Sequence, residues 1–288
     1  MNIFLTGSNG YIGNAFLLKA AKKGNKVFAV TRKKKNRKIK NVKWLIGPIN
    51  KKWSELKKTD ILVHLAAEGV YKKFASFKKC YEFNVIKSEE MIINAIKAGC
   101  KKWLIVSSKK EKKIRSLKLN NKIIKKHELK FNHIHALTKA LFSKICIKYS
   151  AENNSKCRII RLQHVYGGNE KKTRLWPSLI QAAKKNKNLY MTSGNQKTDF
   201  NYIDNVVNGL LDAIDFNKKT QIFPQIWDMG SGKIMSVKEF AIIIWKKLKP
   251  KSKIFFSKIK IYDKKNYTIK SKDLWKIKYT KPENTLKI

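Results

Sequence analysis

Three glycines near the start of the chain have the spacing of a phosphate-binding turn. The sequence GSNGYIG places Gly7, Gly10 and Gly13 directly after the apolar residues 2–6 and before an apolar-periodic segment. In such a strand–turn–helix unit, one glycine permits the tight turn, another lets the backbone approach a pyrophosphate, and the third lets helix and strand pack closely. The helix N-terminus then faces the phosphates. The spacing predicts a dinucleotide site, with an ordinary strand–helix turn as the alternative.

The end of the second expected strand carries basic residues where an acidic residue would favour NAD(H). Residues 26–30 (KVFAV) form that strand, and TRKKK follows. Asp or Glu at this place usually holds the ribose 2′-hydroxyl of NAD(H), whereas a cation accommodates the 2′-phosphate of NADP(H). Since no acid is present, Arg32 and Lys33 favour NADP(H) over NAD(H). A general excess of lysine would produce the same pattern.

Strand and helix patterns alternate through the rest of the chain, which calls for a parallel sheet covered on both faces. We expect a Rossmann-type doubly wound α/β domain over residues 1–165, followed by a smaller α/β substrate lobe over residues 166–288. A helix at 205–216 is expected to return to the first domain. The patterned segments are 60–69, 83–108, 140–149, 158–167, 199–214 and 226–248, the last with a capping box at Ser236 and Glu239.

Taken in order, several motifs resemble the extended short-chain dehydrogenase/reductases, within the NAD-dependent epimerase/dehydratase family that acts on nucleotide sugars. They are TGSNGYIG, DILVHLAA, the helix with Asn84, LIVSS, an H-x-x-T-K segment in place of Y-x-x-S-K, RLQHVYG, TDFNYIDNVVNGLLDA and WDMGSG. The resemblance covers residues 1 to about 280. The stretch TRLWPSLIQAAKKNKNLYMTSGNQKTDF is also similar to 4-ketoreductases and epimerases of surface-polysaccharide gene sets, of the CDP-abequose synthase type.

The resemblance assigns roles to individual residues. In the family, a tyrosine and a serine or threonine address the sugar carbonyl or hydroxyl, and a lysine binds the nicotinamide ribose and lowers the tyrosine pKa. By position, Ser108 is the hydroxyl, Lys139 is the ribose anchor, and His135 stands in the place of the tyrosine. The implied cofactor contacts are Gly7, Asn9, Gly10, Tyr11, Ile12, Gly13, Arg32, Leu65, Ala66, Ala67, Asn84, Lys139 and His164.

Four positions around the expected pocket depart from the family pattern. They are His135 for the tyrosine, KKEKK (109–113) for the V-Y-G or E-Y-G turn with Glu111 as one retained member, His164 for an asparagine, and Thr198 beside Lys197 for an arginine. Neutral imidazole is a poor proton donor, so a reductase using His135 should be most active on the acid side of neutrality. Neutral His135 would be a competent base in the oxidative direction. A hydrogen-bonded pocket residue without a role is the alternative.

Substrate ligands are expected mainly in the second half of the chain. Arg174 has the planar fork that suits a diphosphate, and Trp176 is a candidate for contact with the nucleotide, with packing as the alternative for this ring. The resemblance adds Glu111 and Lys197 as substrate ligands. Because no group of Asp, Glu, His or Cys residues has metal-ligand spacing, we expect no metal site.

The charge of the chain is strongly basic. The sequence has 66 basic and 19 acidic residues, a net charge of +47, and nearly all the basic residues are lysine. Lysine pairs recur throughout, and arginine, the better bidentate ligand of phosphates and bases, is scarce. A dispersed lysine bias, such as an AT-rich genome imposes, is therefore favoured over a nucleic-acid face. The alternative function is a scaffold that has lost catalysis and binds RNA or an anionic surface.

The leading expectation is NADP(H)-dependent redox chemistry at a nucleotide-activated sugar, by 4-keto reduction or epimerisation, for lipopolysaccharide-type precursors. Dehydration is disfavoured because Lys109 and Lys110 follow the serine where water-eliminating relatives have acids. The resemblance also implies a C-terminally shortened lobe and a homodimer through helices 84–98 and 135–149. Four scattered cysteines indicate reduced thiols in the cytoplasm, and no apolar run has the length of a membrane span.

Overall fold

The structure is a computed structural model that describes residues 1–33, 37–70, 76–112, 131–257 and 273–286. The chain forms two compact units, one of Met1–Leu162 with Leu210–Trp227 and the other of Gln163–Gly209 with Asp228–Ile288. The chain leaves the first unit at Leu162 and re-enters it within helix α8 (Ile203–Ala213). Among the residues described, no helix is both long enough and apolar enough to cross a membrane.

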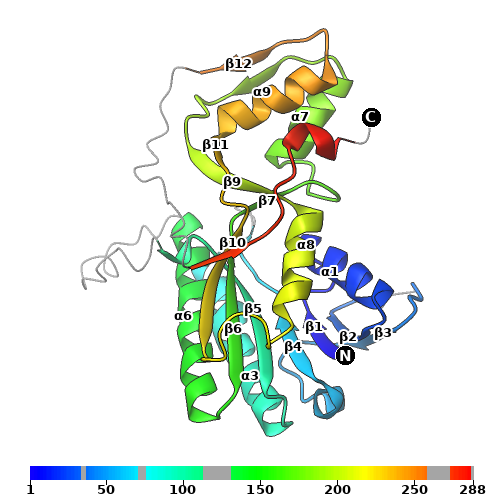
Figure 1. Cartoon of the computed structure of the whole chain (residues 1–288), viewed down its shortest axis with the longest axis vertical. Coiled ribbons are helices and arrows are strands. Elements are labelled where there is room, and N and C mark those ends of the chain that lie inside the picture. The colour runs from blue at the N-terminus through cyan, green and yellow to red at the C-terminus, as the bar shows by residue number, and fades with distance from the viewer. Residues whose placement is uncertain (34–36, 71–75, 113–130, 258–272, 287–288) are drawn as a thin grey trace. The chain divides into compact units, whose positions relative to one another are not determined.

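The first unit is built on a sheet with the strand order β10-β6-β5-β4-β1-β2-β3 (Figure 1). The strands are β1 (Asn2–Thr6), β2 (Lys26–Thr31), β3 (Val42–Ile46), β4 (Ile61–His64), β5 (Lys102–Ser108), β6 (Lys156–Leu162) and β10 (Gln225–Gly230), whose last residues belong to the second unit. Every pair from β6 to β3 is parallel. The strand order reverses beside β1, where ligands bind doubly wound sheets at the carboxyl ends of the strands.

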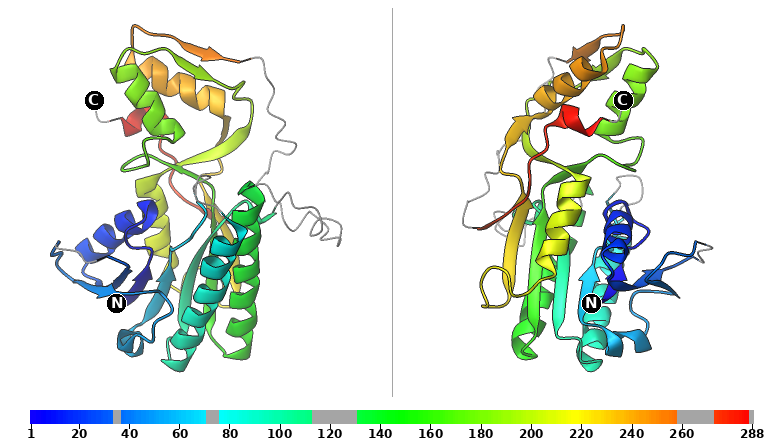
Figure 2. Two further views of the ribbon diagram at one scale, coloured as in Figure 1. Left: turned by 180° about the vertical axis from the view of Figure 1, so that it is seen from behind. Right: turned by 45° about the vertical axis from the view of Figure 1, so that its right-hand side comes forward.

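Helices cover both faces of this sheet. The connection from β1 to β2 runs in one direction and those from β4 through β6 run in the other, so right-handed crossovers place their helices on opposite faces. Figure 2 shows α3 and α6 packed against the strands. The helical segments are α1 (Tyr11–Lys22), η1 (Ser54–Lys58), α2 (Phe77–Tyr81), the π-helical turn η3 (Glu82–Lys87), α3 (Ser88–Lys97) and α6 (Phe131–Glu152).

Two of these elements differ from the sequence prediction. The expected helix at the start of segment 83–108 is continuous with α2 and passes through η3 before it becomes α3. The expected helix 140–149 is the central part of the longer α6. A π-helical turn widens a helix by one residue and often occurs at functional sites, and no apolar periodicity in the sequence marks it.

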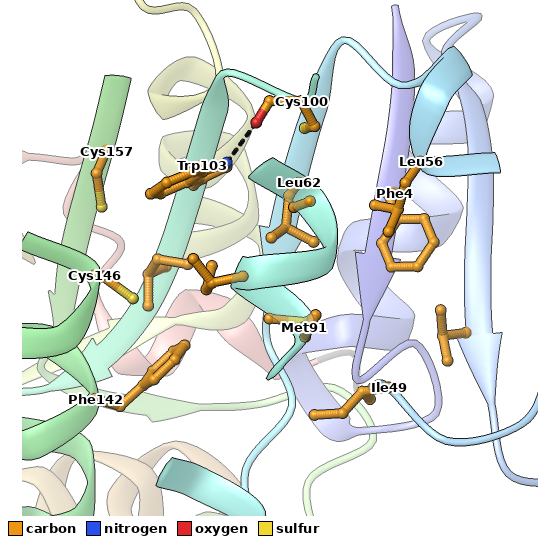
Figure 3. Close-up of a cluster of buried hydrophobic side chains, with 14 of the residues drawn as sticks. Phe4, Ile49, Leu56, Leu62, Met91, Cys100, Trp103, Phe142, Cys146 and Cys157 are labelled. Carbon is orange, nitrogen blue, oxygen red and sulfur yellow. Dashed lines mark hydrogen bonds between the residues drawn. The ribbon is translucent and has the colours of Figure 1, made fainter. Parts of the chain in front are cut away.

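One hydrophobic cluster of the first unit lies on the face of the sheet that α3 and α6 cover (Figure 3). Trp103 is fully buried and donates from Nε1 to the Cys100 carbonyl at 2.7 Å, so its polar atom is satisfied. Cys146 and Cys157 are buried, free thiols among apolar side chains. Burial raises the pKa of the Cys146 thiol well above its usual value, which keeps it protonated.

The second unit contains two small sheets and flanking helices. Its core joins Tyr166, Phe200 and Phe240: the two phenylalanine rings stack at a centroid distance of 4.1 Å, and Tyr166 meets them edge-on at 4.9 and 6.4 Å. The predicted capping box is confirmed, since Ser236 Oγ accepts from the Glu239 amide at 3.0 Å and Glu239 Oε2 accepts from the Ser236 amide at 2.6 Å. The elements are β7 (His164–Tyr166), α7 (Leu175–Lys184), β8 (Leu189–Met191), β9 (Lys197–Tyr202), β11 (Ile234–Ser236), α9 (Val237–Leu248), β12 (Ile254–Phe256), β13 (Leu274–Lys276) and η5 (Pro282–Thr285).

The parallel, doubly wound sheet with helices on both faces confirms the predicted fold class. In the second unit, β11-β9-β7 and β12-β8 form separate sheets, and the end of β10 pairs with β13. In the first unit, β1, β4 and β5 are neighbours in the sheet, and most of the predicted site residues lie at or near their carboxyl ends.

Candidate active site

The glycine turn between β1 and α1 leaves no space for side chains. Gly7 has φ +77°, and a Cβ there would lie 2.6 Å from the Ala66 amide nitrogen. The Gly10 amide donates to the Gly7 carbonyl at 2.8 Å, and a Cβ on Gly13 would overlap that same carbonyl oxygen. Gly7 thus permits both the tight turn and the close approach of β4, and Gly13 permits α1 to pack on the turn.

Side chains of the turn bind it to β2, and no side chain caps the start of α1. Ser8 is buried and donates to the Val30 carbonyl at 2.8 Å, and Asn9 Nδ2 donates to Thr31 Oγ1 at 2.5 Å. Gly10, the N-cap, supplies no side-chain oxygen to the helix, and no acid lies in its first turn. The helix dipole favours an anion at this end of α1. This cradle fits a dinucleotide pyrophosphate.

His64 ends β4 and was not singled out from the sequence. Its Nδ1 is 2.8 Å from Thr6 Oγ1, and the side chain is buried. Burial, followed by the charge of Lys139, holds the His64 pKa well below its usual value, so the ring is neutral. In the sequence, its position at the end of an apolar strand is the signal that could have pointed to it. The contact between Thr6 and His64 joins the ends of β1 and β4.

A cavity of about 390 Å³ lies beside the end of β2 in the first unit. Arg32 is exposed there, and no acidic side chain follows β2 at residues 31–33. Cationic and acidic groups both line the cavity, so its charge is mixed. The lining residues are Arg32, Glu68, Lys79, Glu82, Phe83 and Lys87.

Ser108, His135 and Lys139 come from two adjacent elements of the first unit. Ser108 is the last residue of β5, and His135 and Lys139 lie one turn apart on α6, which packs on β5. Lys139 is buried, and its Nζ donates to the Val106 carbonyl at 2.9 Å and to the Ala66 carbonyl at 3.4 Å. These bonds hold the ammonium between the ends of β4 and β5.

The electrostatics of the pocket favour a neutral histidine and a charged lysine. Burial, and then the positive charges of Lys139 and Lys110, lower the His135 pKa from 6.5 to about 3. Burial lowers the Lys139 pKa to about 8, and the Glu111 charge opposes this. Burial thus disfavours an imidazolium donor at mildly acidic pH, and an acid-side optimum for a reductase stays a prediction. The form that the pocket favours is neutral imidazole.

Asn84 was expected to contact the cofactor, but its side-chain bonds lie within the protein. Its Oδ1 accepts from the Glu68 amide at 2.7 Å, and its Nδ2 donates to the Glu68 carbonyl at 3.1 Å and to Thr138 Oγ1 at 3.0 Å. Both amide protons and one acceptor site are used. Asn84 therefore joins the loop after β4 to α6, and its contact with the cofactor stays a prediction.

Glu111 was expected to contact the substrate, and its burial does not fit that role. The side chain is 0% exposed. Its Oε1 accepts hydrogen bonds from Ser107 and Ser143, the latter at 2.6 Å. The KKEKK segment that departs from the family pattern thus turns its acidic residue inward, toward α6.

Four predicted residues, His164, Arg174, Trp176 and Lys197, belong to the second unit. The His164 ring packs edge-on against Phe200, at a centroid distance of 4.8 Å. Arg174 precedes α7 and donates from Nε to Glu170 at 3.1 Å. Trp176 packs on the aromatic cluster near Tyr166, and Lys197 is exposed at the start of β9. Over the ranges described, no group of three His, Cys, Asp or Glu residues could hold a metal ion.

Comparison with known proteins decides the family. The sequence pattern of the NAD dependent epimerase/dehydratase family matches residues 3–230. The chain belongs to this family. The match confirms the resemblance found in the motifs and spans both the glycine turn and the Ser108–His135–Lys139 group.

Two relatives of this family member carry a more specific name. A CDP-abequose synthase of Salmonella typhimurium is 26% identical over 264 residues, which cover 88% of this chain and 83% of the relative. A CDP-abequose synthase of Salmonella muenchen is 25% identical and covers 91% and 85%. Among solved structures, MoeE5 in complex with UDP-glucose and NAD has a TM-score of 0.73 at 19% identity, covering 91% of this chain and 87% of that one. The structural similarity supports the shared fold.

Proposed function

We propose that this chain is an NAD(P)-dependent enzyme that reduces or epimerises a nucleotide-activated sugar, with a 4-keto sugar as substrate or intermediate, for surface-polysaccharide precursors. One observation carries the proposal. Ser108, His135 and Lys139 occupy adjacent ends of β5 and α6, in the same unit as a glycine turn that fits a pyrophosphate. The CDP-abequose synthase relatives support a nucleotide sugar as substrate.

The residues of the first unit would hold the cofactor at its two ends. Gly7, Gly10 and the first amides of α1 would bind the pyrophosphate, and Lys139 would bind the hydroxyls of the nicotinamide ribose. When bound, the nicotinamide supplies or accepts a hydride. The protein's part is to fix the ribose, exclude water and place a proton-transfer group beside the sugar.

His135 is the proposed proton-transfer residue. The neutral ring that the pocket favours accepts a proton while a sugar hydroxyl is oxidised, and returns it when a keto group is reduced. Ser108 would hold the same sugar oxygen by a hydrogen bond. A group that takes up a proton and then returns it suits a reaction in which a hydroxyl is oxidised and the resulting keto group is reduced. The arrangement of His135 and Ser108 therefore favours epimerisation by transient oxidation over one-way reduction.

The proposed cofactor is NADP(H), because Arg32 follows β2 where an acid would hold the ribose of NAD(H). Arg32→Asp should shift the ratio of NADPH to NADH affinity by about tenfold or more toward NADH, measured by fluorescence titration. Lys102→Asp replaces a cation by the same acid at an exposed residue at the amino end of β5, and should change the ratio much less. Equal shifts in the two variants would show a general electrostatic effect and no dedicated 2′-phosphate ligand.

Arg174 is the proposed diphosphate ligand of the second unit. Glu170 is nearly buried and fixes Arg174 Nε, while 41% of the Arg174 side chain is exposed. The carboxylate thereby sets the guanidinium plane and leaves its terminal nitrogens for a bidentate anion contact. Trp176 and Lys197 are further candidates for contact with the nucleotide and its phosphates.

A homodimer through α3 and α6 is also proposed, from the family resemblance.

The test is turnover with a panel of CDP- and UDP-linked sugars, supplied with NADPH for 4-keto substrates and with NADP⁺ or NAD⁺ for hydroxyl substrates. Cofactor-dependent conversion of one class, with saturation in the nucleotide sugar, is the expected result. If the chain converts none of them and instead binds RNA with an affinity that falls steeply with salt, the alternative of an RNA-binding scaffold replaces the proposal.

A further inference from the structure

A buried carboxylate lies behind the ammonium of Lys139, in a segment that departs from the family pattern. Glu111 is fully buried, and its Oε1 accepts from Ser107 and from Ser143. Within the described ranges, Glu111 Oε2 is a buried oxygen without a hydrogen-bond partner. A group in such surroundings needs a compensating charge to remain ionised.

The two serines connect this carboxylate to both sides of Lys139. Ser107 follows Val106, whose carbonyl accepts the Lys139 ammonium at 2.9 Å. Ser143 lies four residues after Lys139 on α6, so both side chains project from the same face of the helix. The hydrogen bonds therefore hold the Glu111 carboxylate on the side of the chain where the Lys139 ammonium is buried.

Two serine hydroxyls converge on Oε1 of Glu111, an arrangement that suits a carboxylate acceptor. Glu111 Oε2 has no hydrogen-bond partner among the described residues, so a charge there depends on nearby cations for compensation. Burial is the largest influence and raises the Glu111 pKa above its usual value, whereas the two serine hydrogen bonds and the charges of Arg161 and Lys139 favour the carboxylate.

The other titratable groups around Lys139 do not supply a negative charge. His64 and His135 are held neutral by burial, and burial keeps the Cys146 thiol protonated. Arg161 is a second cation that acts on Glu111. Among the groups that influence Lys139 in the described structure, Glu111 is thus the one that opposes its desolvation at neutral pH.

We propose that Glu111 is a positioning residue that keeps Lys139 charged, so that the buried ammonium can bind the ribose hydroxyls of the cofactor at neutral pH. The inference rests on the proposed function only in that Lys139 is the ribose ligand. The carboxylate touches neither cofactor nor sugar, and it acts through the lysine. The KKEKK segment, which stands in place of the family's turn, would then supply at Glu111 a buried charge that supports Lys139.

The test is the pH dependence of NADPH binding, followed by fluorescence from about pH 6 to about pH 9. The wild type should lose affinity with a midpoint near the Lys139 pKa of about 8. Glu111→Gln keeps the shape and removes the charge, so its midpoint should fall by roughly one pH unit or more, with affinity at the acid end within about twofold of wild type. Lys139→Met should bind NADPH with an affinity that no longer changes with pH around pH 8.

Ser143→Ala is the matched control, because it removes a hydrogen bond to Glu111 and keeps the carboxylate. Its midpoint should move by much less than that of Glu111→Gln. If Glu111→Gln does not fold, Glu111→Asp and Glu111→Asn make the same comparison, since they differ from each other chiefly in charge. An unchanged midpoint in the uncharged variant would overturn the inference and leave Glu111 a packing residue.

This experiment separates the inference from the proposed function, because binding of NADPH requires no sugar. A shifted midpoint in a chain that converts no nucleotide sugar would keep the Glu111–Lys139 pair and refute the proposed reaction. Turnover of a nucleotide sugar together with an unshifted midpoint would support the proposed reaction and refute the role of Glu111.

Discussion

Replacing Gly7 by alanine tests the geometry of the cofactor turn most sharply, because the chain contains a matched control. Gly7 and Gly24 both have positive φ angles, +77° and +83°. A Cβ at Gly7 would lie 2.6 Å from the Leu65 carbonyl carbon and from the Ala66 amide nitrogen, whereas a Cβ at Gly24 would meet nothing within 4 Å. The two substitutions therefore share the backbone strain and differ in the collision.

The magnitudes follow from these distances. A left-handed alanine costs about 1–2 kcal/mol at either position. At Gly7 the neighbouring atoms are backbone, which cannot turn aside, so the ends of β1 and β4 must separate at a further cost of about 1–3 kcal/mol. We expect Gly24→Ala to lower the melting temperature by roughly 2–8 °C and Gly7→Ala by clearly more.

The assay combines thermal melts with NADPH titration. Gly24→Ala should bind NADPH within about twofold of wild type, because its site is remote from the turn. Gly7→Ala should lose at least about tenfold in affinity, since the displaced turn no longer presents the first amides of α1 to a pyrophosphate. Equal losses of stability and unchanged binding in both variants would refute the close approach of β4 to the turn.

Three further predictions concern stability. Arg158→Met should lower the melting temperature by roughly 10 °C, because the buried guanidinium donates at 2.7–2.9 Å to Gln225 and to three carbonyls that would lose their partner. Ser236→Ala should cost about 1 kcal/mol in urea unfolding through loss of the capping box, and Ser236→Asn much less. His135 is protonated in the unfolded chain below about pH 6.5, but in the folded protein only near pH 3. Wild type should therefore lose about 1.4 kcal/mol per pH unit more than His135→Phe as the pH falls through that window, and parallel curves would count against a half-buried histidine that stays neutral.

The parts of this protein that were predictable from sequence are those set by neighbouring residues. The glycine turn, the strand and helix alternation and the capping box at Ser236 each depend on a few consecutive residues, so their patterns are visible in the chain. The doubly wound parallel fold class followed from that alternation.

The contacts that set the chemistry of the site were not predictable in this way. Glu111 accepts from a serine 32 residues later, and Asn84 binds a threonine 54 residues later. In the sequence, Glu111 is surrounded by lysines and has the appearance of a solvated loop residue, because the pattern cannot show which side chain turns inward. The lowered pKa of His135 also depends on burial, which the sequence pattern does not show.

The central claim is that His135 performs the family's proton transfer, and turnover by a series of variants at this position tests it most directly. Wild type, His135→Ala and His135→Tyr should be compared for cofactor-dependent conversion of the best nucleotide sugar, each with NADPH affinity measured in parallel. We predict that wild type is active and that His135→Ala retains NADPH binding but loses at least about a hundredfold in kcat. Tight NADPH binding by wild type, with turnover appearing only in His135→Tyr, would contradict the account.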